Sequence, residues 1–141
     1  MITLVVGLPG TGKTTYVREN IGDGLAYDFD AIAAALRVTE PHKIVNYAAR
    51  NFADDFLPVF MEMAGKYTAN LFIIRTAPTI EELDTINPNR IVICTRVYTD
   101  RRDSINMNRY ANKIRDIEMY AERNGVEITY LPELPGYLRQ Y

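Results

Sequence analysis

The stretch LVVGLPGTGKTTY, Leu4 to Tyr16, passes from an apolar run through three glycines to a lysine and two threonines. The apolar run has the length of a strand, and the residues from Lys13 onward have helical composition, so the stretch predicts a strand, a tight bend and a helix. Glycines let the backbone bend closely with its N–H groups turned inward. Such a nest, at the positive end of a following helix, favours phosphate oxygens.

The spacing supports this interpretation, because Gly7, Gly12, Lys13 and Thr14 match the pattern glycine, any four residues, glycine, lysine, threonine of the Walker A motif, or P-loop. In that motif the lysine ammonium contacts the outer phosphates and the threonine hydroxyl is a magnesium ligand. We therefore expect a site for Mg²⁺ and ATP or GTP. ATP is favoured because no segment resembles the guanine-reading Asn-Lys-x-Asp element. The expected nucleotide-binding residues are Gly7, Leu8, Pro9, Gly10, Thr11, Gly12, Lys13, Thr14 and Thr15. The alternative is a plain glycine turn with a solvated Lys13.

The composition of the 141-residue chain suits one domain, which we expect to span residues 1–141, since 48% of the residues are hydrophobic. The net charge of −2 gives no global basic field for bulk nucleic-acid or membrane binding. The lone Cys94 and the lone His42 leave no internal disulfide and no zinc cluster to build. We see no targeting segment and no membrane span, and we expect an unprocessed cytoplasmic protein.

Short apolar runs alternate with segments of helical composition along the chain. The expected strands are Ile2 to Val6, Leu25 to Phe29, Leu71 to Ile74, Ile91 to Cys94 and, more weakly, Val126 to Leu131. The expected helices are Lys13 to Asn20, Ala31 to Arg37, Ile44 to Tyr67, Thr79 to Ile86 and about Asp100 to Arg123. Strands that are apolar on both faces indicate a parallel sheet covered on both sides, so the fold class is α/β. Pro58 predicts a kink or a pair of helices within the third helical segment.

The stretch LAYDFDAIAAALR, Leu25 to Arg37, adds two carboxylates at the end of the second strand, Asp28 and Asp30. Two residues apart on an extended chain, they would face one side, and Asp30 would also cap the next helix. A carboxylate there can accept the proton of an attacking hydroxyl, or hold magnesium through water. The alternative is a cap and a solvated edge residue.

Together, GLPGTGKTT and YDFDAIAAALR give a resemblance to the P-loop kinases with an acidic second-strand end, such as polynucleotide kinase, adenylylsulfate kinase and zeta-toxin-like kinases. The chain looks like a compact phage or prophage type of member. The resemblance implies a three-layer α/β/α sandwich around a parallel five-stranded sheet, the P-loop NTPase fold. It also implies that Asp30 or Asp28 acts as the acceptor base. Such kinases often carry an acceptor-binding arginine one turn later, where this chain has Ala33, so Arg37 is the nearest candidate.

The third strand ends without the usual magnesium-shell aspartate of P-loop proteins, since Arg75 and Thr76 follow LFII. Asp28 or Asp30 would then take the metal role, or the site binds nucleotide without efficient turnover. Arg75 would hold an acceptor phosphate or pair with a surface acid. After the fourth strand, Arg101 and Arg102 are candidates for a mobile lid that closes on the transferring phosphates. The alternative for this arginine-rich segment is a solvated amphipathic helix.

The sequence thus predicts an ATP-dependent phosphotransferase whose acceptor is a nucleoside, a nucleotide, a polynucleotide 5′-hydroxyl or another small molecule. The runner-up is an ATP hydrolase that acts on a partner, and the third alternative is a nucleotide-binding module without turnover. We expect no membrane partner. The oligomeric state stays open.

Overall fold

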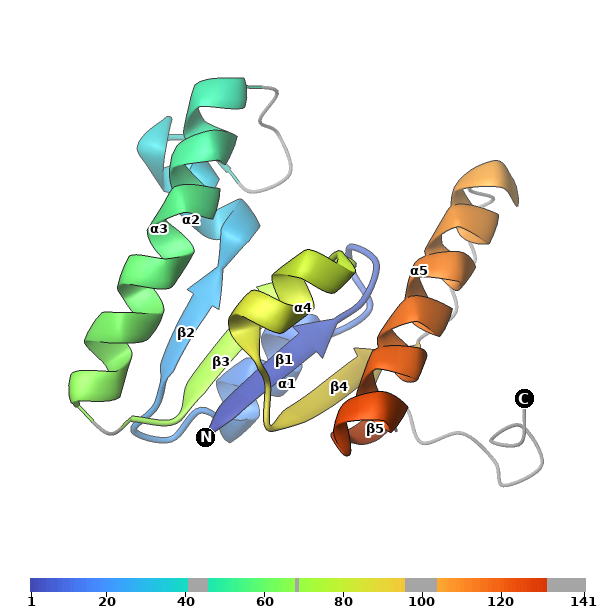
Figure 1. Ribbon diagram of the computed structural model, residues 1–141. Helices are drawn as coiled ribbons and strands as arrows, with labels where there is room; N and C mark the ends of the chain where they lie inside the picture. The colour runs from blue at the N-terminus through green and yellow to red at the C-terminus, as the bar shows by residue number, and fades with distance from the viewer. Residues whose placement is uncertain (41–45, 68, 96–103, 132–141) are drawn as a thin grey trace.

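The computed structural model describes residues 1–40, 46–67, 69–95 and 104–131 of the chain, with only the backbone of 104–108. Its centre is a five-stranded parallel sheet in the order β2-β3-β1-β4-β5 (Figure 1). The strands are β1 Ile2–Val6, β2 Leu25–Asp28, β3 Leu71–Arg75, β4 Arg90–Cys94 and β5 Glu127–Leu131. Each lies within a residue or two of its predicted position, and the predicted parallel sheet is confirmed.

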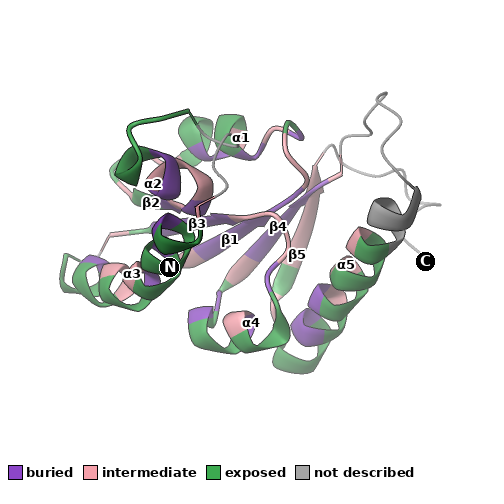
Figure 2. Ribbon diagram, turned by 90° about the horizontal axis from the view of Figure 1, so that it is seen from above, coloured by how far each residue is buried: buried purple, intermediate pink, exposed green. Residues whose placement is uncertain are grey.

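Helices cover both faces of this sheet and make the predicted three layers. The helices are α1 Lys13–Asn20, α2 Phe29–Leu36, α3 Tyr47–Lys66, α4 Ile80–Ile86 and α5 Ser104–Asn124. Figure 2 shows α1 on one face and α3, α4 and α5 on the other. No helix within the described residues is long and apolar enough to span a bilayer.

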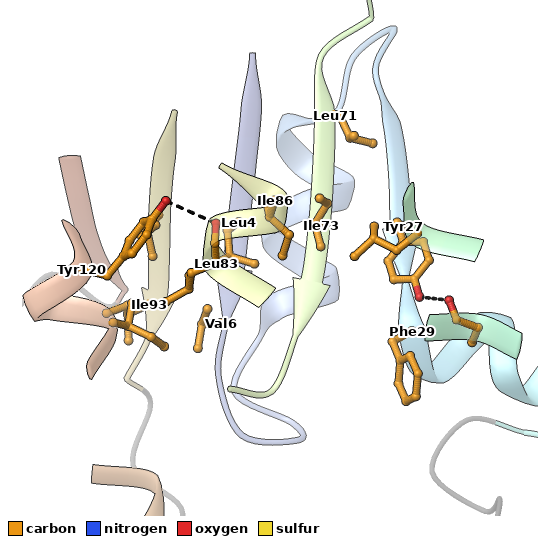
Figure 3. Close-up of a cluster of buried hydrophobic side chains, with 14 of the residues drawn as sticks. Leu4, Val6, Tyr27, Phe29, Leu71, Ile73, Leu83, Ile86, Ile93 and Tyr120 are labelled. Atoms are coloured by element: carbon orange, nitrogen blue, oxygen red, sulfur yellow. Dashed lines mark hydrogen bonds between the residues drawn. The ribbon is translucent and has the colours of Figure 1, made fainter. Parts of the chain in front are cut away.

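The larger of two apolar cores fills the face under α3, α4 and α5 (Figure 3). Strand β1 contributes to both cores: Leu4 and Val6 face the larger one, while Val5 faces the smaller one under α1, and all three are fully buried. Burial on both faces explains why the strands appear as unbroken apolar runs in the sequence. Tyrosine hydroxyls buried in the larger core have hydrogen-bond acceptors. The hydroxyl of Tyr27, for example, donates to the backbone carbonyl of Ala53.

Helix α3 differs from the sequence expectation at Pro58. The helix runs without a break from Tyr47 to Lys66, so of the two expected outcomes the pair of helices is wrong, while the kink stays a prediction. Pro58 has no N–H to donate to the carbonyl of Asp54, four residues earlier. Both residues are exposed, so water can replace the missing hydrogen bond and the helix continues.

The carboxyl ends of the strands meet at one edge of the sheet. In the register, Val6 at the end of β1 lies between Arg75 of β3 and Ile93 of β4. Asp28 at the end of β2 lies beside Ile74 of β3. The glycine bend after β1 and the acidic pair after β2 therefore reach the same edge, which is where open parallel sheets bind ligands.

Candidate active site

The glycine bend joins β1 to α1 in a conformation that needs its glycines. Gly10 and Gly12 have φ values of 76° and 97°, in the left-handed region that favours glycine. At Gly7 the constraint is space, because a Cβ there would lie 2.5 Å from Thr11 Oγ1 and 2.9 Å from the Cβ of Cys94. The bend therefore packs directly on the end of β4, with no room for a side chain at its first position.

Hydrogen bonds of the bend hold it in place. The N–H of Gly7 donates to the carbonyl of Thr76, just after β3, at 3.2 Å. The N–H and the hydroxyl of Thr11 donate to the carbonyl of Leu8 at 3.3 and 2.7 Å. The bend is thus anchored to the neighbouring strand end and closed on itself, which is the preorganisation a phosphate-binding loop needs.

The side chain of Lys13, the first residue of α1, folds back onto this bend. Its Nζ donates to the carbonyl of Gly7 within the buried interior of the loop. Burial lowers the pKa of Lys13, while the carboxylates of Asp30 and, more weakly, Asp28 act to raise it. A cation held at the loop and facing two carboxylates is placed where an incoming polyanion would meet it.

A cavity of about 290 Å³ opens beside the loop, at the ends of β2 and β3. Lys13 and Thr14 line it from α1, and Asp28 and Asp30 line it from the start of α2. The charged residues that line it are Lys13, Asp28, Asp30, Arg50, Arg75, Glu82 and Lys113. The structure therefore brings the predicted lysine, threonine and acidic pair together in one cavity. Among the described residues, no group of three or more histidine, cysteine and acidic side chains could hold a metal ion.

The two carboxylates differ in local structure. Strand β2 ends at Asp28, which is the N-cap of α2 and accepts a hydrogen bond from the N–H of Ala31 at 3.3 Å. The prediction that Asp30 is the cap was wrong, because the chain turns helical at Phe29 and leaves Asp30 in the first turn. Asp28 and Asp30 therefore do not share one side of an extended strand. They reach the cavity from the cap and the first turn of α2 instead.

Arg75, at the end of β3, is bound on several sides. Its Nη1 lies 2.9 Å from Asp54 Oδ1 and its Nη2 lies 2.5 Å from Glu82 Oε2. Its guanidinium also lies over the ring of Phe29, 4.6 Å from the ring centre. Of the two roles expected for Arg75, the pairing with acids is present in the structure, while an acceptor contact stays a prediction.

Several residues of the cavity were not expected there from the sequence, among them Phe29, Arg50 and Glu82. Arg50 comes from α3, and its guanidinium lies 5.6 Å from the centre of the Phe29 ring. Phe29 is a buried aromatic between two aspartates, and that pattern is a signal that could have marked it. Nothing local marks Arg50, because its place depends on how α3 packs against α2.

Some predicted site residues do not line the cavity, and others fall outside the described residues. Arg37 caps the carboxyl end of α2, is exposed, and is not among the residues that line the cavity. Helix α2 carries it seven residues, about 10 Å along the axis, beyond Asp30. Arg101 and Arg102 fall outside the described residues. Thr15 is exposed on the first turn of α1.

Comparison with known proteins extends the fold assignment. The structure of thymidylate kinase from Ehrlichia chaffeensis is similar to this one with a TM-score of 0.50 and 15% sequence identity, over 93% of this chain and 91% of that chain. No protein-family model and no curated protein matches the sequence. A match over nearly the full length of both chains, with the predicted five-stranded sheet, shows the α/β fold of P-loop kinases.

Proposed function

We propose that residues 1–141 act as one nucleotide-binding domain that transfers the γ-phosphoryl group of ATP to an acceptor hydroxyl. The observation that carries the proposal is the buried Lys13 ammonium, which is held at the glycine bend and lines the same cavity as Asp28 and Asp30. Phosphoryl transfer depends on such positioning and on charge stabilisation more than on covalent chemistry by the protein. The fold of P-loop kinases supports the same class of reaction.

Magnesium fits the oxygen donors at this cavity. The hydroxyl of Thr14 lies at the start of α1, and the carboxylates of Asp28 and Asp30 line the same space. In our proposal Thr14 holds the ion directly, and one of the carboxylates holds it through water. The bound ion would neutralise charge on the nucleotide phosphates.

We assign the role of general base to Asp30. Asp28 is the N-cap of α2 and Asp30 lies in its first turn, and of the two carboxylates Asp30 acts more strongly on the charge of Lys13. The acceptor hydroxyl passes its proton to Asp30 as its oxygen bonds to the γ-phosphorus. The bond from that phosphorus to the oxygen shared with the β-phosphate breaks, and ADP leaves.

The finer expectations from the sequence remain part of the proposal. Arg101 and Arg102 would close over the transferring phosphates, and Arg37 would contact the acceptor. The proposed place of this chain in the branch of polynucleotide, adenylylsulfate and zeta-toxin-like kinases, as a compact phage type of member, rests only on the motifs GLPGTGKTT and YDFDAIAAALR. The similar thymidylate kinase acts, by its name, on a nucleotide, which keeps nucleotides among the candidate acceptors.

The reaction is tested by asking whether ADP formation needs an acceptor. Purified protein with Mg·ATP should form ADP slowly alone and much faster once a suitable hydroxyl compound from a panel is added. Rapid ADP formation that no acceptor changes would instead support the ATP hydrolase. Tight ATP binding with no ADP formed under any condition would support a nucleotide-binding module.

A further inference from the structure

Arg75 is a cationic side chain that lines the cavity, and its charge is already compensated by two acidic side chains. Asp54 of α3 and Glu82 of α4 bind its two terminal nitrogens at 2.9 and 2.5 Å. The face of the guanidinium lies 4.6 Å from the centre of the Phe29 ring. Only 14% of the Arg75 side chain is exposed. An acceptor phosphate at this position would have to replace a carboxylate or share the guanidinium with both of them.

Such a replacement is unfavourable, because the carboxylate that loses Arg75 would stay in the same cluster, next to the phosphate. Two carboxylates and one guanidinium give the Asp54–Arg75–Glu82 cluster a net charge of −1. Charge-assisted pairs with a guanidinium are among the stronger hydrogen bonds in proteins. Like charges forced together in a partly buried site repel each other. The cluster therefore disfavours a second anion at the end of β3.

The remaining bases of the cavity do not reverse this balance. Arg50 and Lys113 line it but are exposed, so water screens their charges, as it also screens that of the half-exposed Asp54. Asp28 and Asp30, at the start of α2, add two negative charges to the lining of the cavity. Lys13 belongs to the nucleotide loop in our proposal and is not available to the acceptor.

The cavity also offers apolar contacts beside the cluster. Phe29, Ile74 and Ala77 are the apolar residues among those that line it, and the Phe29 ring lies next to the Arg75 guanidinium. A flat, uncharged ring can pack on such a surface, while carboxylates and a threonine hydroxyl give hydrogen bonds to its polar edge. Thr79, at the start of α4, supplies such a hydroxyl.

We propose that the acceptor is a small, uncharged hydroxyl compound, such as a nucleoside or a sugar, and not a nucleoside monophosphate. This inference rests on the proposed phosphotransferase function and chooses among its acceptors. The reason is the pairing of Arg75 with both Asp54 and Glu82, which leaves the acceptor side of the cavity without a buried cation whose charge is uncompensated.

The test compares matched acceptors in a coupled ADP assay with Mg·ATP. The pairs are nucleosides and their 5′-monophosphates, for example thymidine and thymidine 5′-monophosphate, with simple sugars and a 5′-hydroxyl oligonucleotide beside them. We expect kcat/KM at least about tenfold higher for an uncharged acceptor than for any anionic one. A preference for a monophosphate, or for the oligonucleotide, whose terminal nucleoside carries a 3′-phosphate, overturns the inference. Turnover with none of these acceptors overturns it as well, and calorimetry with Mg·ATP then shows separately whether the nucleotide site itself exists.

A second experiment removes the acidic partners of Arg75 one at a time and uses matched control variants. Glu82→Gln and Asp54→Asn each remove one of its charged partners, so each should raise kcat/KM for the monophosphate about tenfold relative to the uncharged acceptor. Glu81→Gln and Asp55→Asn remove the same charge from exposed neighbours on the same helices, and the described structure gives them no contact with Arg75. Both control variants should leave the ratio of kcat/KM for the monophosphate to kcat/KM for the uncharged acceptor unchanged. Thermal melts identify any variant that fails to fold, and an unchanged ratio in both folded release variants contradicts the role given to Arg75.

Discussion

The ammonium of Lys13 donates a hydrogen bond to the carbonyl oxygen of Gly7, six residues earlier, in the buried interior of the glycine bend. The hydrogen bond fixes the cation over the loop whose backbone would hold phosphates. Burial disfavours the charged form and lowers the pKa of Lys13, so the ammonium costs the folded protein some stability. A charge kept in such a place is consistent with a binding role and not with a stabilising one.

Lys13→Ala should abolish phosphoryl transfer, with a loss of at least about 100-fold in kcat/KM, because it removes the cation that faces the outer phosphates. Its melting temperature should stay near that of the wild type, since a buried charge is removed along with its contact to Gly7. Lys66→Ala, at an exposed lysine in the last turn of α3, is the matched control and should keep full activity. Activity of Lys13→Ala close to the wild-type level would contradict the assignment.

Gly7→Ala should destabilise the loop, because the added Cβ would lie 2.5 Å from Thr11 Oγ1 and 2.9 Å from the Cβ of Cys94. We expect a loss of about 1 to 3 kcal/mol in the free energy of unfolding, as for other overpacked sites, together with weaker ATP binding. Gly65→Ala in α3 meets no atom within 4 Å and should gain about 0.5 kcal/mol. Chemical denaturation measures both, and equal stability changes in the two variants would contradict the packing described here.

Asp30→Asn should spare ATP binding and lower kcat by about 100-fold or more, the usual contribution of a general base. Asp28→Asn should keep most activity and stability, because asparagine caps helices as well as aspartate does. Asp28→Ala should lose about 1 kcal/mol of stability through the missing cap. Transfer assays and thermal melts on the three variants separate the roles. Retained turnover in Asp30→Asn, or its loss in Asp28→Asn, would move the base to the other carboxylate.

The stability of the fold should decrease above pH 10. Burial raises the pKa of Tyr27 from 10.0 to about 12, so the unfolded chain releases this proton at a lower pH than the folded one. The contribution of Tyr27 is complete below pH 10, and it falls by up to about 1 kcal/mol per pH unit between pH 10 and 12. Tyr27→Phe, which also loses the hydrogen bond to Ala53, should show a flatter decline over this range in urea titrations. If the free energy of unfolding falls equally steeply with pH in the wild type and in Tyr27→Phe, the raised pKa of Tyr27 is contradicted.

The sequence predicted those parts of the fold that depend on neighbouring residues. The bend from Gly7 to Gly12 follows from local backbone chemistry, and the buried strands follow from apolar runs such as that ending at Val6. The start of α2 was misplaced by two residues, because both Asp28 and Asp30 are good caps and the choice is made by Phe29. The ring of Phe29 packs into the larger core, and this packing begins the helix one residue after Asp28.

The contacts on the acceptor side of the cavity could not be predicted from the sequence. The sequence left open whether Arg75 holds an acceptor phosphate or pairs with an acid, and only the packing of α3 and α4 brings Asp54 and Glu82 to it. Arg50 reaches the cavity for the same reason, from a helix with no motif of its own. Such contacts join residues distant in the sequence, and neither spacing nor composition encodes them.

The central claim is that the glycine bend and Lys13 form a site for a nucleoside triphosphate. Isothermal titration calorimetry of Mg·ATP, and separately of Mg·GTP, into the folded protein tests it most directly. We expect saturable heat at one site per chain with ATP, and binding at least about 100-fold weaker in Lys13→Ala. A folded wild-type protein that gives no binding heat with either nucleotide, over a range of temperatures, would contradict it.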